Sequence, residues 1–120
     1  MDFRSNIPLY LQVMADIKKK IIKGQLMPGE KLPSTRELAA LYQINPNTVV
    51  RVYNEMELQH LTFTKRGIGT FITEDTHRLS LLKEEMAKLL AGELVKELKD
   101  IGYTKEEFLD TVARIYDVTL

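Results

Sequence analysis

The chain has 120 residues, 44% of them hydrophobic and 28% charged, a composition typical of one globular domain or of a small domain with an appendage. Its 17 basic and 17 acidic residues give a net charge of zero, so charge balance alone does not indicate a nucleic-acid partner. The absence of cysteine excludes disulfides and thiolate metal sites, and no apolar run reaches the ~18 residues of a membrane span, so we expect a soluble, cytoplasmic protein without a membrane partner.

The first predicted helix begins at Pro8 and ends near Gly24. Its apolar residues recur at steps of three and four, the period of one helix face, at Tyr10, Met14, Ile17 and Ile21. Four lysines gather toward its end, where cations suit the negative pole of the helix dipole. We interpret this basic end as solvated rather than as a DNA contact.

The next predicted helix starts with a capping box and ends near Tyr42. Ser34 and Glu37 have the spacing at which each side chain accepts a hydrogen bond from the other's backbone N–H. We expect its inner face to consist of Leu38, Ala39 and Leu41.

A third helix is predicted after a break of three residues, and two short helices so joined are typical of a helix-turn-helix. Asn45 is a favourable N-cap, and Pro46 suits the first helical position. The predicted buried stripe consists of Val49, Val52, Tyr53 and Met56. The opposite face is small, polar or cationic, with Asn47, Thr48, Val50, Arg51 and Asn54.

Residues 61–73 change to a strand pattern. Residues 61–64 and 69–73 are rich in β-branched and aromatic side chains, and Lys65, Arg66 and Gly67 lie in the turn between them. A hairpin after a helix-turn-helix is a wing. Its two cations suit a phosphate or minor-groove contact, with solubility at a turn as the alternative.

Residues 77–120 are predicted to be helical. A first helix of about 25 residues, about 37 Å long, is too long to be buried by the preceding domain, so its apolar stripe requires a partner, which we expect to be a second copy of the chain. Gly102 can end it, and Thr104 and Glu107 form a second capping box before a shorter helix. The predicted dimer contacts are Leu79, Leu82, Met86, Leu90, Leu94, Leu98, Phe108, Val112 and Ile115.

Four motifs in this order resemble the GntR family of bacterial repressors. They are Pro-Leu-Tyr at 8–10, Pro-Gly-Glu-Lys-Leu-Pro-Ser-Thr-Arg-Glu-Leu-Ala at 28–39, Asn-Thr-Val at 47–49 and Gly-Ile-Gly-Thr-Phe-Ile at 67–72. The helical tail is similar to the YtrA subfamily, whose members lack the large effector-binding domain and dimerise through two tail helices. The resemblance implies a mainly α fold with a small β-hairpin, in which a winged helix-turn-helix DNA-binding domain (1–75) precedes a helical dimerisation tail (76–120).

The resemblance also implies roles for individual residues. Arg36 matches an arginine directed at the DNA backbone, and Asn45, Asn47 and Thr48 match the start of the recognition helix. Arg51 lies beside the position that commonly reads bases, which Val50 occupies here. The wing tip matches at Arg66 and Gly67. The full predicted DNA-binding set is Ser34, Thr35, Arg36, Asn45, Asn47, Thr48, Arg51, Lys65, Arg66 and Gly67.

Two of these arginines have structural alternatives. Arg36 could form a surface ion pair with Glu37 or Glu30, and Arg51 could bridge to Glu55 four residues later.

The function expected from these observations is that of a sequence-specific transcriptional regulator, a repressor that binds a palindromic operator in double-stranded DNA as a homodimer. The alternative is a winged-helix protein-interaction module that does not bind DNA. The sequence shows no nucleophile–base pairing, no metal-spaced histidines and no phosphate-cradling glycine loop, so we expect neither an enzyme nor a cofactor or metal. The family resemblance implies a small-molecule effector, which is unidentified and for which the tail helices are a hypothetical site.

Overall fold

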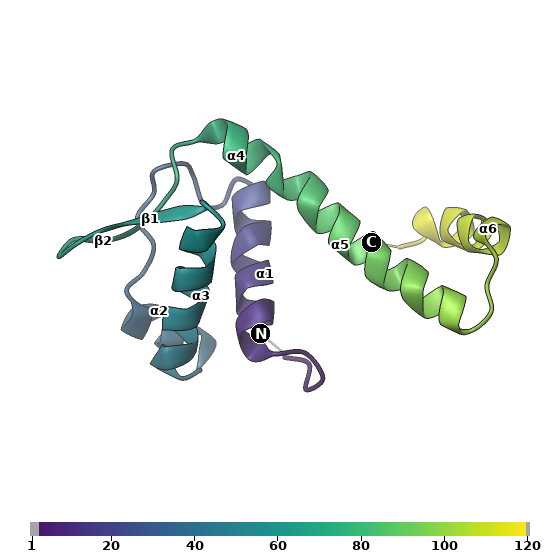
Figure 1. The fold of residues 1–120 in the computed structure, drawn as a ribbon, viewed down its shortest axis with the longest axis horizontal. Helices are drawn as coiled ribbons and strands as arrows, with labels where there is room; N and C mark the ends of the chain where they lie inside the picture. The colour runs from purple at the N-terminus through teal and green to yellow at the C-terminus, as the bar shows by residue number, and fades with distance from the viewer. Residues whose placement is uncertain (1–2, 120) are drawn as a thin grey trace. The chain divides into compact units, whose positions relative to one another are not determined.

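The computed structural model describes residues 3–119. In chain order this part contains α1 (Leu9–Ile22), α2 (Thr35–Tyr42), α3 (Pro46–Leu58), β1 (Thr62–Lys65), β2 (Gly69–Ile72), α4 (Thr76–Ser80), α5 (Leu82–Asp100) and α6 (Lys105–Tyr116) (Figure 1). The predicted mainly α fold with one small hairpin is confirmed. The chain forms two compact units, Met1–Lys83 and Glu84–Leu120. The functional division at residue 75 stays a prediction.

The core of the first unit lies between α1, α3 and the base of the hairpin. The stripe predicted on α3 is buried in full, and Leu61 and Ile72 are completely buried beside it. On α1 the buried residues are Val13, Met14, Ile17 and Ile21. Burial of these side chains is the main stabilising term for the three-helix arrangement.

Local capping fixes both helices of the helix-turn-helix. The Glu37 backbone N–H donates to Ser34 Oγ (3.1 Å) and the Ser34 N–H donates to Glu37 Oε1 (3.0 Å), so the predicted capping box is confirmed. The Asn47 N–H donates to Asn45 Oδ1 (2.8 Å) at the start of α3. The turn between the helices passes through Gln43, whose φ of 56° is left-handed.

The inward orientation predicted for Leu41 is wrong, because its side chain is 73% exposed. The buried side of α2 is centred on Leu38 and Ala39. At about 100° per residue, Leu41 lies about 110° around the helix from the midpoint between Leu38 and Ala39 and therefore points away from the core.

The wing is a two-stranded antiparallel hairpin. Thr62 pairs with Ile72 at its base and Lys65 with Gly69 at its tip. Its base is tied to the segment before α2, since the Leu32 N–H donates to the Thr70 carbonyl (2.8 Å) and the Ile72 N–H to the Glu30 carbonyl (2.8 Å). The wing and the start of the helix-turn-helix are thus joined by backbone hydrogen bonds.

The single long helix predicted after the wing is interrupted. α4 ends at Ser80, and α5 begins at Leu82. Arg78 Nε donates to the Gln59 carbonyl (2.8 Å), which ties α4 to the end of α3. Leu79 packs against the core and Leu82 is only 1% exposed. Leu82 is therefore part of the core of the first unit and Leu79 is half-buried against it, whereas their contribution to a dimer stays a prediction.

The second unit contains α6 and all of α5 beyond its first two residues. The chain leaves α5 through Gly102 (φ 87°), where the Tyr103 N–H donates to the Leu98 carbonyl (2.9 Å). Thr104 and Glu107 form the second predicted capping box. Within residues 84–119 no side chain is buried. The unit therefore has apolar residues but no buried core of its own.

No helix among residues 3–119 has the length and hydropathy that crossing a bilayer requires.

Candidate nucleic-acid interface

The predicted DNA-binding residues all lie in the first unit, on α2, on α3 and at the wing tip. These three elements lie on one side of α1 (Figure 1). At the start of α3, Asn45, Asn47 and Arg51 are exposed and Thr48 is half-buried. The N–H groups at this end are used locally, since Pro46 has none, the Asn47 N–H donates to Asn45 Oδ1 and the Thr48 N–H donates to the Asn45 carbonyl (2.9 Å), so the short polar side chains are what this end presents to solvent.

Arg36 lies in the first turn of α2, and its side chain is exposed. Among residues 3–119 it forms no hydrogen bond or ion pair, so the predicted alternative of a surface ion pair is not realised. The two carboxylates that could have paired with it are used locally. Glu37 accepts from Ser34, and Glu30 accepts from the Met27 N–H (3.1 Å). The Ser34 hydrogen bonds lower the pKa of Glu37.

The two remaining predicted DNA-binding residues at the start of α2 are less available for contact with DNA. Ser34 is exposed, but its hydroxyl already accepts the capping hydrogen bond. Thr35 is half-buried at the first position of the helix.

Arg51 stacks on an aromatic ring of another helix. Its Cζ atom lies 3.7 Å from the centroid of the Tyr10 ring on α1. In the part of the chain that the structure describes, Arg51 forms neither a hydrogen bond nor a salt bridge, so the alternative bridge to Glu55 is absent. The sequence pattern placed Tyr10 on an apolar helix face and gave no signal for this contact.

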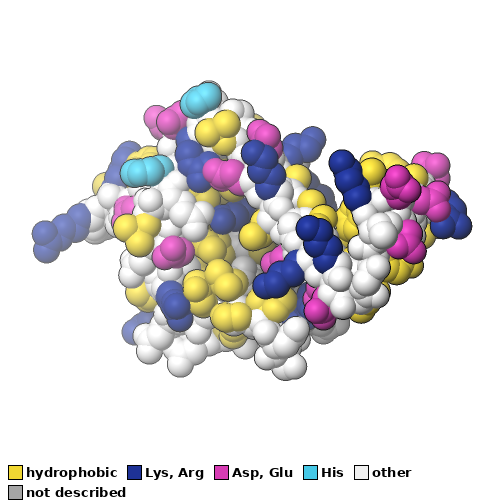
Figure 2. Space-filling view, turned by 45° about the vertical axis from the view of Figure 1, so that its right-hand side comes forward, with side chains coloured by type: hydrophobic (Ala, Val, Ile, Leu, Met, Phe, Trp, Pro, Cys, Tyr) yellow, Lys and Arg dark blue, Asp and Glu magenta, His cyan; other side chains and the backbone are white. Residues whose placement is uncertain are grey.

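The wing tip carries two cations in different surroundings. Lys65 Nζ lies 5.1 Å from the ring centroid of Phe71 and 5.8 Å from that of Phe63, and the two rings stack at 5.5 Å. Arg66 is exposed and has no hydrogen bond or ion pair within the described residues. Figure 2 shows Lys and Arg side chains gathered at the protruding end on the left of the molecule.

The turn that presents these cations depends on Gly67, which has a φ of 78°. A side chain would be strained in this left-handed conformation. The neighbouring Ile68 is 60% exposed at the same turn.

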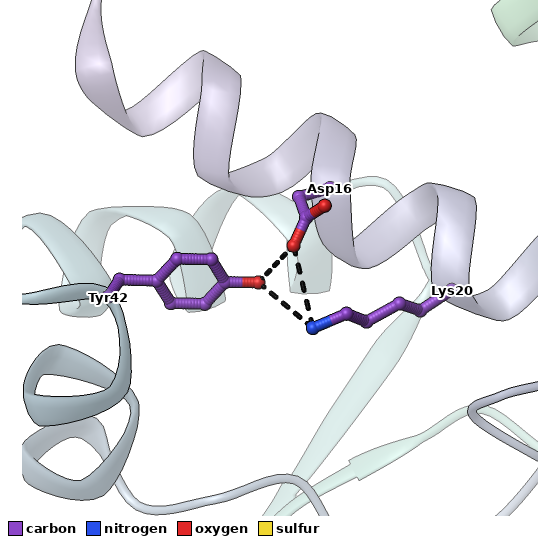
Figure 3. A network of polar contacts seen from close by, with 3 residues as sticks. All are labelled: Asp16, Lys20 and Tyr42. Atoms are coloured by element: carbon purple, nitrogen blue, oxygen red, sulfur yellow. Dashed lines mark hydrogen bonds and ion pairs between the residues drawn. The ribbon is translucent and has the colours of Figure 1, made fainter. Parts of the chain in front are cut away.

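A polar network joins α1 to α2 behind the interface (Figure 3). The Tyr42 hydroxyl donates to the Asp16 carboxylate, and Lys20 Nζ lies 3.4 Å from the Tyr42 oxygen and 3.5 Å from Asp16 Oδ2. Burial, followed by the hydrogen bond to Asp16, raises the pKa of Tyr42, so its hydroxyl stays a donor. Lys20 is therefore part of this network, which differs from the solvated helix end that the sequence suggested.

A second tyrosine holds α3 to the start of α2. The Tyr53 hydroxyl donates to the Pro33 carbonyl (2.7 Å), and burial raises its pKa. These two tyrosines link α2 to both helices that flank it.

The remaining predicted dimer residues lie on the second unit. Leu90, Leu94 and Ile115 are 55%, 46% and 52% exposed. Partial burial is found for Met86, Leu98, Phe108 and Val112.

Comparison with known proteins identifies the family. Residues 9–72 match the family model described as "Bacterial regulatory proteins, gntR family". The chain is 41% identical to the uncharacterized HTH-type transcriptional regulator YhcF of Bacillus subtilis, over 92% of this chain and 91% of that protein. It is 38% identical to the HTH-type transcriptional repressor YtrA of the same organism, over 75% and 74%.

A solved structure extends the likeness to nearly the whole chain. The GntR family transcriptional regulator from Listeria monocytogenes is 35% identical and superposes with a TM-score of 0.82, covering 93% of this chain and 98% of that one.

Proposed function

The chain belongs to the gntR family of bacterial regulatory proteins, and we propose that it is a cytoplasmic repressor that binds a palindromic operator as a homodimer. Like its relatives, it is a helix-turn-helix transcriptional regulator and not an enzyme. The observation that carries DNA binding is the exposure of unpaired cations on this fold. Arg36 and Arg66 are exposed and, within residues 3–119, have no protein partner.

The proposed contacts divide into positioning and reading. The start of α3 enters the major groove, as the second helix of a helix-turn-helix does. Arg36 and the wing cations contact phosphates, which gives affinity without sequence information. Asn47 and Arg51 meet base edges, since amide and guanidinium groups can pair bidentately with purines.

The second unit supports the proposed homodimer. None of its described side chains is buried, and the apolar side chains of Leu90 and Leu94 are exposed on α5. Exposed apolar surface of this kind is typical of an association surface, and a two-fold pair is the commonest closed arrangement. A two-fold dimer fits half-sites about one helical turn apart. The 38% identity to a named repressor, YtrA, supports repression over activation.

We retain the hypothesis that a small-molecule effector binds between the tail helices. A ligand found by thermal shift supports it only if that ligand also changes affinity for the operator.

Selection of bound sequences from random duplex DNA tests the proposal. We expect enrichment of a two-fold symmetric site, and we expect a variant carrying both Arg36→Ala and Arg66→Ala to lose binding to it at moderate salt. Failure of the unaltered protein to enrich any duplex at low salt rejects DNA binding. Binding of a protein partner in that case favours the interaction-module alternative.

A further inference from the structure

The stacked pair of Arg51 and Tyr10 joins a predicted base-contacting side chain to a helix outside the helix-turn-helix. The guanidinium carbon lies 3.7 Å from the ring centroid, well inside the ~6 Å range of cation–π contacts. Tyr10 is half-buried and packs against the core of the first unit, so the ring is held in place. Arg51 is exposed.

We propose that Tyr10 is a positioning residue, which holds the Arg51 guanidinium flat against α1 so that its edge reads a base pair. This inference rests on the proposed function, because it assigns a role within the same DNA interface.

The chemistry of guanidinium favours this role over simple anchoring. Stacking uses the face of the planar group and leaves its N–H donors, which point outward from the edge, free to pair with a guanine. Among residues 3–119 none of these donors is used. A side chain already held in one orientation also loses less conformational freedom on binding, so contact with a base becomes more favourable.

The other two arginines of the candidate interface lack such a ring contact. Arg36 and Arg66 contact no aromatic ring within the described residues. A flexible cation can neutralise a phosphate from many orientations, whereas bidentate base reading requires one orientation. We therefore assign base selectivity to Arg51 and treat Arg66 as the matched control.

The first experiment measures the contact in the free protein. By NMR we expect the Arg51 side-chain protons to be shifted upfield by the Tyr10 ring current. The shift persists in Tyr10→Phe, which keeps the ring, and disappears in Tyr10→Leu. An unshifted Arg51 in the unaltered protein overturns the proposal without any DNA measurement.

The second experiment is a double-mutant cycle on the duplex that the unaltered protein selects. We expect Tyr10→Phe to bind within about twofold of the unaltered protein and Tyr10→Leu to bind about threefold to tenfold more weakly. Tyr10→Leu should add no further loss in an Arg51→Ala background but should add its full loss in an Arg66→Ala background, because distant sites are additive.

Base preference separates positioning from a structural role. Repeated selection with Tyr10→Leu should weaken discrimination at the same base pair that loses discrimination in Arg51→Ala. If the loss from Tyr10→Leu is the same with and without Arg51, or if base preference is unchanged, Tyr10 does not position Arg51. Thermal unfolding checks that each variant is folded, and Tyr10→Met replaces Tyr10→Leu if the latter is not.

Failure of this inference differs from failure of the proposed function. If the unaltered protein enriches no duplex, DNA binding itself is wrong and the positioning role falls with it. If it binds a selected duplex but the cycle shows no coupling, only the role of Tyr10 is wrong.

Discussion

The three arginines of the candidate interface differ in what holds each side chain. Arg51 rests on Tyr10, whereas Arg36 and Arg66 extend into solvent without a protein partner in the described part of the chain. A cation without a fixed orientation contributes mainly through its charge, and charge contacts with phosphate weaken as salt rises because releasing counterions into a more concentrated solution gains less entropy. Salt dependence therefore separates the two kinds of arginine.

We expect Arg36→Ala to weaken binding by a similar factor on every duplex and to reduce the slope of log affinity against log salt by about one. Fluorescence anisotropy at several salt concentrations measures this. Arg114→Ala is the control, since this arginine lies on α6 and pairs with Asp110 four residues earlier. An unchanged slope in Arg36→Ala would show that Arg36 makes no phosphate contact.

Tyr42 and Tyr53 make stability depend on pH in the alkaline range. Burial raises the pKa of both above the value of about 10 expected when unfolded, so above about pH 10 the folded state holds protons that the unfolded chain releases. The contribution to folding stability is therefore fully present below about pH 10 and is lost as pH rises further.

The matching variant carries both Tyr42→Phe and Tyr53→Phe. Its free energy of unfolding, from urea denaturation between about pH 8 and pH 11, should fall less steeply with pH than that of the unaltered protein. Tyr116→Phe, at an exposed tyrosine, should keep the original steepness. Parallel pH curves for the double variant and the unaltered protein would contradict the assignment.

At the scale of elements, α4 and α5 are separated at Leu81, between two residues, Arg78 and Leu82, that are held by the first unit. Leu81 and Leu82 are adjacent leucines, yet Leu81 is 41% exposed and Leu82 is 1% exposed.

We expect Leu82→Ala to lower the free energy of unfolding by about 2–5 kcal/mol, because it leaves a cavity in the core. Leu81→Ala should change it by about 0.5 kcal/mol or less. Urea denaturation compares them, and equal losses would contradict the burial of Leu82.

The features that were predictable from sequence are those determined by neighbours in the chain. The capping boxes at Ser34 and Thr104, the proline at the start of α3 and the basic turn of the hairpin all depend on residues a few positions apart. The helical stripe of α3 was equally clear, because core burial imposes the helix period.

The features that were missed depend on contacts between distant segments. The contact of Tyr10 with Arg51, the Asp16–Tyr42 hydrogen bond and the burial of Leu82 in the first unit leave no periodic signature in the sequence. For the same reason the residue types of the candidate site could be predicted, but the ring that holds Arg51 could not.

For the whole molecule, the balance of 17 basic and 17 acidic residues means that DNA affinity must come from where the cations lie. A single winged helix offers few such contacts. Two winged helices on a two-fold operator double the number of contacts between cations and DNA, provided that the second units of two chains associate. The dimer is therefore part of the proposed DNA-binding function rather than an addition to it.

We expect a variant carrying both Leu90→Glu and Leu94→Glu to be monomeric, because burying like charges without partners between two apolar faces is strongly unfavourable. Sedimentation should show a dimer for the unaltered protein and a monomer for the variant. Leu41→Glu, at an exposed leucine of α2, controls for loss of apolar surface and should leave the dimer intact.

For the monomeric variant, affinity for the full operator should fall much further than affinity for an isolated half-site, because only the full site depends on two linked domains. A monomeric unaltered protein, or equal losses on both duplexes, would reject the dimer as the binding species.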